Sequence, residues 1–298
     1  MAHEIELKLA LSAAGVTQLV SHPLLAGHEA SIQRLANTYF DTPARALEKA
    51  RIAMRLRSNG TDYWQTVKTA GSGRGGLHAR GEWEWPVSTD RLDLDGLRQL
   101  PLEPFQDEAL LAALGPVYCT DFERTAWRLE HEGTTVELAL DQGAIIAADK
   151  RCAIRELELE LKDGELKDGA EDALWRLAET LADSVALRPA NTSKAARAVA
   201  LRDNAWPRLN VMAADGQHPP RQLMEDAITA LDAYTDTHDT QFLERARHAL
   251  AAVETHPDPT VVRLATTLRQ ALTRADWLTP SFGRDSLMLL SRLSAEPY

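Results

Sequence analysis

Charged residues occupy every second position in several short segments of this 298-residue chain. Glu4, Glu6 and Lys8 alternate with apolar residues near the N-terminus, and Arg55 and Arg57 repeat the pattern with cations. Successive side chains of a β-strand point to opposite faces, so the charged residues of each segment would share one face. Lysine and arginine bind phosphate oxygens, and carboxylates bind hard divalent cations. Together the two groups would suit metal-assisted phosphoryl transfer.

Other segments place acids or bases in the same way. Glu82 and Glu84 alternate with tryptophan, and three glutamates between residues 156 and 160 alternate with leucine. The further charged candidates on expected strands are Lys68, Arg124, Asp141, Glu156, Glu158 and Glu160.

A sheet with one solvated face would show the same alternation, and for any single strand this is the simpler interpretation. Three features of the whole set favour a charged face that points inward. The polar positions are almost all fully charged, acid-only and base-only segments are separate, and the residues between them are large and apolar. If the sheet closes with this face inside, its lumen holds both a basic and an acidic cluster.

The segments that would position these residues are mostly short strands. Alternating or β-rich composition predicts strands at 2–10, 31–40, 51–58, 62–69, 79–87, 117–130, 134–140, 144–149 and 152–161. Helical patterns lie at about 12–21, 90–99, 105–113, 165–183 and 192–203. This order indicates an α+β fold class, with an antiparallel barrel or sandwich and helices outside it.

The composition changes after Trp206-Pro207. From about residue 219 onward apolar residues recur every three or four positions, which predicts an all-α region. This region contains no lysine and more acidic than basic residues. We place a boundary near 206–218, which gives one domain at 1–205 and a helical C-terminal domain at 218–298.

The overall composition excludes several classes of protein. A net charge of −11 argues against a nucleic-acid partner, although a local basic pocket can still bind a small anion. No stretch approaches the roughly 20 apolar residues of a membrane span, and no secretory signal is expected. Cys119 and Cys152 have no metal-site or disulfide-framework spacing. We therefore expect no membrane partner and a cytoplasmic protein.

The ordered set of motifs resembles the CYTH family, also called triphosphate tunnel metalloenzymes. Its N-terminal Glu-x-Glu-x-Lys signature is matched by Glu4, Glu6 and Lys8. The other matches, in chain order, are Tyr39-Phe40-Asp41-Thr42, Arg55 with Arg57, Lys68, Arg80 with Glu82 and Glu84, Arg124, Asp141, Glu156 with Glu158 and Glu160, and Lys194. The resemblance covers residues 1 to about 203.

The resemblance implies an eight-stranded antiparallel β-barrel tunnel with surrounding helices, which binds a triphosphate and Mg²⁺ or Mn²⁺. Phosphate oxygens would be held by Lys8, Arg55, Arg57, Lys68, Arg80, Arg124 and Lys194. Metal ions would be held by Glu4, Glu6, Asp141, Glu156 and Glu158. The residues expected to be catalytic are Lys8, Glu4, Glu6 and Lys194, whereas Glu82, Glu84 and Glu160 could either bind metal or pair with lumen cations.

The function implied is hydrolysis of inorganic triphosphate to pyrophosphate and phosphate. Adenylate cyclase, thiamine triphosphatase and nucleoside triphosphatase activities of the same family share this lumen, so they stay open. A non-catalytic polyphosphate-binding module is a further alternative, but a pure binder would not need five or more carboxylates that face its ligand.

The C-terminal region shows a fainter resemblance to the CHAD domain, which is linked to polyphosphate. Residues 239–247 and the Gly283-Arg284-Asp285 turn carry it. The region is much shorter than a CHAD domain and lacks its basic ridge. We expect a degenerate helical appendage that packs on the barrel or forms a homodimer contact, and we expect hydrolysis to survive deletion of 215–298.

Overall fold

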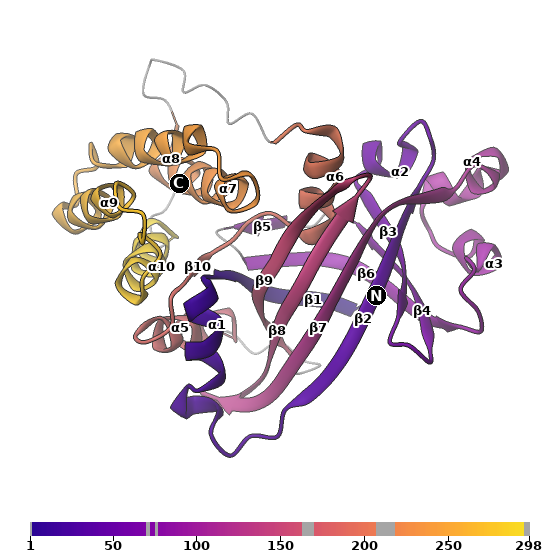
Figure 1. Cartoon of the computed structure of the whole chain (residues 1–298), viewed down its shortest axis with the longest axis horizontal. Coiled ribbons are helices and arrows are strands. Elements are labelled where there is room, and N and C mark those ends of the chain that lie inside the picture. The colour runs from indigo at the N-terminus through magenta and orange to yellow at the C-terminus, as the bar shows by residue number, and fades with distance from the viewer. Residues whose placement is uncertain (1, 70–71, 75–76, 163–169, 207–217, 295–298) are drawn as a thin grey trace.

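The computed structural model describes residues 2–69, 72–74, 77–162, 170–206 and 218–294 (Figure 1). Side chains are described at these positions except at 2–4, 72–74, 77–80 and 170. The side chains of Glu4 and Arg80 therefore lie outside the described part. Their backbones are described, and the two residues are register partners in neighbouring strands. The predicted boundary at 206–218 also lies almost entirely outside the described residues.

Ten strands form one antiparallel sheet in the described part of the chain. They are β1 (Ala2–Leu11), β2 (Ser31–Asp41), β3 (Ile52–Ser58), β4 (Tyr63–Thr69), β5 (Ser72–Arg74), β6 (Leu77–Val87), β7 (Gly115–His131), β8 (Thr134–Ala147), β9 (Lys150–Leu161) and β10 (Leu187–Pro189). The strand order is β10-β1-β9-β8-β7-β2-β3-β4-β6-β5. In addition, β1 pairs with β6 through Ala2–Leu7, along the edge of β1 opposite to the edge that pairs with β9.

The strand count differs from the expected eight. The short strands β5 and β10 extend the sheet, and neither has enough alternating residues to be predicted from sequence. The segments predicted as separate strands at 134–140 and 144–149 form the single strand β8. Gly143 lies between them, and it does not break the strand because it faces Phe122 of β7 across the ladder. A Cβ atom at Gly143 would meet the Asp121 carbonyl oxygen at 2.1 Å and the Phe122 Cα at 2.4 Å.

Helices lie beside the sheet and make up the C-terminal region. Those before residue 206 are α1 (Ala13–Val20), η1 (Pro23–Leu25), α2 (Ala46–Lys49), α3 (Leu94–Arg98), η2 (Glu103–Gln106), α4 (Glu108–Ala112), α5 (Ala170–Ala182) and α6 (Lys194–Asp203). Each of the five predicted helical segments contains a helix, and four of these helices are shorter than predicted, whereas residues 165–169 of the fifth segment lie outside the described part. The C-terminal helices are α7 (Pro220–Thr237), α8 (Thr240–Val253), α9 (Pro259–Ala271) and α10 (Pro280–Ser294), which confirms an all-α region after the sheet.

The apolar side of the alternating strands is the main core. Leu7 and Leu9 of β1 join Leu157 and Leu159 of β9 and Leu177 of α5 in one buried cluster. Burying this face under helices turns the charged positions to the opposite face of the sheet. A smaller cluster buries Phe105 with the outer sides of β3, β4 and β6, and includes the two tryptophans that alternate with glutamate.

The part of the charged face that β1, β8 and β9 form is buried, which argues against the simpler interpretation of the alternation there. Glu6 and Lys8 are each 2% exposed, Glu156 is 3% exposed and Asp141 is fully buried. Buried charges need partners or a ligand, because an isolated ion is costly to remove from water.

The C-terminal helices form a second core that touches the first. Leu231, Leu250, Leu264 and Leu290 pack together, and Trp175 of α5 is partly buried against them. Helix α10 also contributes to the main core, since its Leu287 belongs to the same cluster as the strand leucines. Gly283 of α10 lies so close to β10 that a Cβ atom there would meet the Leu187 carbonyl oxygen at 2.2 Å. Among the described residues, no helix is long and apolar enough to span a bilayer.

We predict that Gly143→Ala destabilises the fold by about 3 kcal/mol, because its methyl group would push β8 away from the β7 backbone. The measurement is urea denaturation followed by circular dichroism. The matched control is Gly115→Ala in β7, where a Cβ atom would meet nothing within 4 Å. Equal effects of the two variants would contradict the close approach at Gly143.

Candidate active site

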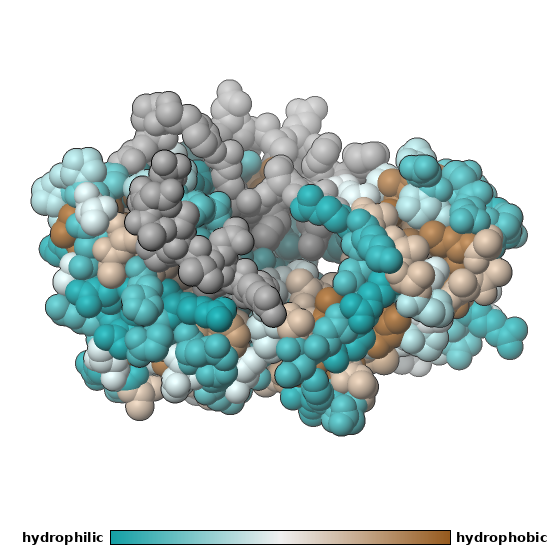
Figure 2. Space-filling model, turned by 90° about the horizontal axis from the view of Figure 1, so that it is seen from above, coloured by the Kyte–Doolittle hydropathy of each residue, from teal (hydrophilic) through white to brown (hydrophobic). Residues whose placement is uncertain are grey.

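The charged face lines a cavity of about 1520 Å³. Strands β1, β2, β3, β4, β6, β7 and β9 contribute to its walls, and the first turn of α6 borders it. Seen from above, the molecule presents a mainly hydrophilic face with apolar residues scattered over it (Figure 2). The cavity is large enough for a small polyanion and its counterions.

Three carboxylates gather beside the cavity, and one of them, Glu158, lines it. Asp141 of β8 is the register partner of Glu156 in β9, and Glu158 lies two residues further along the same face of β9. One oxygen from each carboxylate lies within 4.8 Å of the other two. Oxygen ligands at this spacing suit a hard divalent cation such as Mg²⁺ or Mn²⁺. The donor set therefore fits the metal that the sequence resemblance implies.

Two lysines and an arginine neutralise this carboxylate cluster. Lys8 Nζ lies 3.2 Å from Glu156 Oε1 and 3.1 Å from Glu158 Oε1. Arg124 donates from Nε to Asp141 Oδ1 at 2.7 Å and from Nη2 to Glu158 Oε2 at 2.5 Å. The cross-strand register dictates these contacts, because Lys8 is opposite Glu158 and Arg124 is opposite Asp141.

Lys194 reaches the same cluster from a helix. Ser193 caps α6 by accepting a hydrogen bond from the Ala196 N–H, so Lys194 is the first helical residue and points into the cavity. Its Nζ lies 2.8 Å from Asp141 Oδ2 and 2.9 Å from Glu158 Oε1, and it also contacts Glu156. The side chain is fixed by three carboxylates at once.

These contacts set the charge states of the cluster. Burial alone would raise the pKa of Glu158, but the positive charges of Lys194, Lys8 and Arg124 outweigh it and hold the pKa well below 4.5. Burial would lower the pKa of Lys194, but Asp141, Glu156 and Glu158 raise it above its ordinary value. Glu158 is therefore ionised at neutral pH and available to a metal ion.

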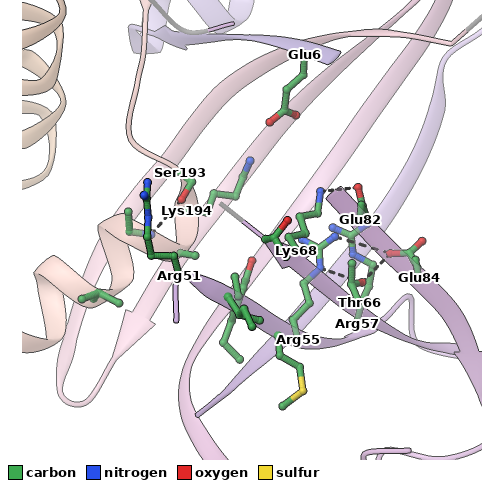
Figure 3. A pocket seen from close by; sticks show the side chains of 18 of the residues that line it. Glu6, Arg51, Arg55, Arg57, Thr66, Lys68, Glu82, Glu84, Ser193 and Lys194 are labelled. Atoms are coloured by element: carbon green, nitrogen blue, oxygen red, sulfur yellow. Dashed lines mark hydrogen bonds and ion pairs between the residues drawn. The ribbon is translucent and has the colours of Figure 1, made fainter. Parts of the chain in front are cut away.

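A basic group lies on the wall formed by β3, β4 and β6. Figure 3 shows Arg55, Arg57 and Lys68 close to Glu82 and Glu84, with Lys194 on the other side of the open space. Lys68 Nζ lies 3.0 Å from Glu82 Oε2, and Arg55 Nη2 lies 3.9 Å from Glu84 Oε2. Positive charges thus face the cavity from both walls.

The surroundings of Arg57 disfavour its positive charge. Burial lowers its pKa to about 10, together with the positive charges of Arg55 and Arg124. Its Nε donates to Asn37 Oδ1 at 2.9 Å, and Asn37 is itself held by Thr120. An anion that enters the cavity would relieve the repulsion among these guanidinium groups.

Three buried polar residues around the basic group were not among the predicted site residues. Tyr39 of β2 stacks on Tyr118 with ring centroids 4.7 Å apart. Burial would raise the pKa of Tyr39, but the charge and hydrogen bond of Arg55 lower it. Thr66 accepts from Arg55 Nε at 3.3 Å and donates to Glu84 Oε2 at 2.7 Å, while Asn37 orients Arg57. Strand alternation could have found Thr66, which lies two residues before Lys68 on β4, whereas Asn37 and Tyr39 meet Arg57 and Arg55 only through the register of β2 with β3.

Comparison with known proteins agrees with this geometry. The model of the CYTH domain family matches residues 2–199, which is about two thirds of the chain. The chain belongs to the CYTH family. The match ends before the C-terminal helices, so their likeness to a CHAD domain stays a prediction.

The CYTH region is similar to a curated protein and to a solved structure. The inorganic triphosphatase of Haemophilus influenzae is 34% identical over 200 residues, which is 66% of this chain and 54% of that protein. The chain therefore spans about half the length of this curated relative. A structure from Hippeastrum, described as a candidate adenylyl cyclase with a dominant triphosphatase activity, covers 70% of this chain and 99% of its own, with 17% identity and a TM-score of 0.50. The second likeness concerns the fold alone.

The structure brings most predicted CYTH residues to the one cavity. Those whose described side chains line the cavity or the adjoining carboxylate cluster are Glu6, Lys8, Arg55, Arg57, Lys68, Arg124, Asp141, Glu156, Glu158 and Lys194. Glu4 and Arg80 lie outside the described side chains. Glu6 approaches Lys8 at 3.8 Å and is separate from the three-carboxylate group.

The three glutamates whose role was left open all lie beside cations or donors. Glu160 Oε2 is 2.8 Å from Lys162 Nζ, Glu82 pairs with Lys68, and Glu84 accepts from Thr66. Each of the three has a lysine or arginine within 4 Å, and among the described residues none of them belongs to the group of three carboxylates whose oxygens lie within 4.8 Å of one another. Asp41, in the tyrosine-containing motif, instead supports α2 by accepting from the N–H groups of Leu47 and Glu48.

We predict that the stability contributed by Glu158 depends on pH. Its folded-state pKa is depressed, so its carboxylate stabilises the fold above about pH 4.5, and this contribution is lost as the pH falls toward the folded value. Glu158→Gln should lower the free energy of unfolding by about 3 kcal/mol at pH 7. The difference from wild type should shrink when urea denaturation is repeated between pH 4.5 and pH 3.

The matched control is Glu123→Gln in β7, whose half-exposed carboxylate lies 3.9 Å from the exposed Arg34. This surface pair should contribute less than about 1 kcal/mol at either pH. A Glu158→Gln effect that stays constant across the pH range would contradict the depressed pKa.

Proposed function

We propose that this chain hydrolyses inorganic triphosphate to pyrophosphate and phosphate, with the help of a divalent cation bound in the tunnel. The observation that carries the proposal is a cavity that a metal-compatible carboxylate group adjoins on one side and that arginine and lysine side chains line on the other. The relationship to a protein named inorganic triphosphatase supports the choice of substrate.

The proposal includes a tunnel closed by eight strands. In support, β1 pairs with β9 along one edge and with β6 along the other. The run β1-β9-β8-β7-β2-β3-β4-β6 then returns to its first strand, with β5 and β10 outside the ring. A closed ring keeps the charged side chains apart from bulk water, where their interactions with phosphate would be weaker.

The metal ion would be held by Asp141, Glu156 and Glu158, with Glu6 and Glu4 as further candidates on β1. We propose Mg²⁺ or Mn²⁺, because three carboxylate oxygens with room for water and phosphate oxygens suit these ions. When bound, the cation would supply positive charge to phosphoryl oxygens and lower the pKa of an attacking water. Lys8 and Lys194 compensate the same carboxylates before the cation binds.

The substrate would be held between the two walls. Arg55, Arg57 and Lys68 face the cavity and would bind phosphate oxygens from one side, with Arg80 as a further candidate. Lys8, Lys194 and Arg124 would bind the other side once the metal takes over part of their carboxylate contacts. Phosphoryl transfer depends mainly on such positioning and charge stabilisation, so an oriented water can attack the terminal phosphorus while pyrophosphate leaves.

The domain assignment and cellular setting are further parts of the proposal. Residues 1–205 would form the tunnel domain and 218–298 a helical domain with its own core, as the two hydrophobic clusters suggest. A cytoplasmic location and a homodimer contact through the helices remain predictions. Adenylate cyclase, thiamine triphosphatase and nucleoside triphosphatase activities are the alternatives that the experiment below separates.

Phosphate release should be measured with triphosphate, ATP and thiamine triphosphate, each with Mg²⁺, with Mn²⁺ and with excess chelator. We expect turnover of triphosphate to exceed that of the organic substrates by at least about tenfold, and to vanish on chelation because the carboxylates alone cannot stabilise the transferred group. Equal turnover of ATP would refute the substrate assignment. Tight binding without turnover would instead establish a binding module.

We predict opposite effects of Arg57→Gln on binding and on stability. The folded protein lowers the pKa of Arg57 to about 10, so its charge is less favourable in the fold than in the unfolded chain. The variant should therefore unfold at the same or a higher urea concentration. Its KM for triphosphate should rise roughly 10- to 100-fold, because charge-assisted contacts to phosphate are lost.

The matched control is Arg34→Gln in β2, whose side chain is 87% exposed. It should leave both KM and stability unchanged. An Arg57→Gln variant with normal KM would remove Arg57 from the substrate site.

A further inference from the structure

One face of α7 lies against the segment that carries Lys194. Glu225, Thr229, Asp232 and Asp236 are spaced four, three and four residues apart, so they share a single side of the helix. We propose that Asp232 and Asp236 of this face are positioning residues for triphosphate hydrolysis, which act by fixing the segment 188–197 and through it Lys194 and Glu156. This inference rests on the proposed function.

Asp232 holds the backbone just before the helix that bears Lys194. Its Oδ2 accepts hydrogen bonds from the N–H groups of Asn191 and Thr192, both at 2.9 Å. Its Oδ1 accepts from Arg188 Nη1 at 2.6 Å, and both side chains of this ion pair are at most 5% exposed. A buried carboxylate with three charge-assisted or backbone contacts is a rigid anchor.

Other residues of α7 bind the same segment. The Asn191 side chain donates from Nδ2 to the Glu225 carbonyl oxygen at 3.2 Å, and Arg188 Nη2 donates to Thr235 Oγ1 at 3.0 Å. Thr229 borders the cavity itself, beside Asn191 and Thr192. The C-terminal region thus contributes to the wall of the site.

Asp236 acts on the carboxylate cluster through an arginine of α6. It accepts from Arg197 Nη2 at 2.6 Å and from Arg197 Nε at 2.8 Å. The Nη1 atom of the same guanidinium lies 3.8 Å from Glu156 Oε2. Arg197 also donates to the Ala153 carbonyl oxygen in β9 at 2.6 Å, which fixes its plane.

The distance from these anchors to the chemistry is short. Thr192 is two residues before Lys194, and Lys194 Nζ reaches Asp141 Oδ2 at 2.8 Å. A displacement of about 1 Å at such a group can reduce turnover roughly a hundredfold. The structure therefore changes the sequence-based expectation that hydrolysis survives deletion of 215–298, because that deletion removes both anchors.

The test is Asp232→Asn in the full chain, with Asp226→Asn as the matched control. Asp226 lies on the same helix, and its carboxylate accepts from Gln222 at the surface. We expect kcat/KM for triphosphate to fall roughly 10- to 100-fold in Asp232→Asn, and to stay at the wild-type value in Asp226→Asn. Equal kcat/KM in the two variants would overturn the proposal.

A double variant separates positioning from general destabilisation. If Asp232 acts through Lys194, then adding Asp232→Asn to Lys194→Ala should cost little further activity, because the two changes affect one unit. Multiplied losses at matched thermal stability would overturn the proposal. If Asp232→Asn does not fold, Asp236→Asn tests the second anchor, and its kcat/KM should also fall, through Glu156.

The wild-type protein tests the proposed function independently of the positioning role. A wild-type protein that releases no phosphate from triphosphate would refute the function alone. The variants would then be compared by calorimetric binding of tripolyphosphate, where weaker binding by Asp232→Asn than by Asp226→Asn supports the positioning role. Equal affinities would refute it.

Discussion

Burial of opposite charges beside one cavity is the constraint on which the rest of the molecule depends. Asp141 and Glu156 are almost completely removed from water, and each would be strongly unfavourable without a cation beside it. Lys8 and Lys194 supply that charge from two different elements, a strand and a helix. The fold must therefore hold strands β1, β8 and β9 in one register and keep α6 beside them. A slip of one residue in β1 would move Lys8 to the apolar side of the sheet.

Under the proposed function, this balance of charges would allow the side chains of the cavity to exchange partners when ligands bind. The carboxylates and cations compensate each other in the structure, and a divalent ion with a polyanion would present the same charges in another arrangement. Folding has already removed these charged side chains from water. A ligand therefore needs only to replace the ion pairs among them with stronger contacts. The fold disfavours the positive charge of Arg57, so a bound anion would be favoured on the side of the cavity that carries Arg57.

Sequence alone could predict the charged strands because alternation has a fixed period. Glu6, Lys8, Arg55 and Glu158 were found in this way, and the buried leucines between them confirm the two faces. Lys194 was predicted only by resemblance, since a single lysine at a helix start carries no periodic signal. Asp232 was missed because its contacts join residues about forty positions apart, and only the packing of α7 on the segment after β10 brings them together. The predicted number of strands was wrong because the three-residue strands β5 and β10 are too short to show alternation.

The family match ends at residue 199, but the hydrophobic interior does not. Leu287 of α10 is fully buried in the cluster that lies under β1 and β9, and Gly283 lets the helix backbone rest on β10. A fragment cut at the end of the family match would expose this apolar patch to water, and patches of this kind promote aggregation. The family match and the main hydrophobic cluster therefore end at different places in the chain.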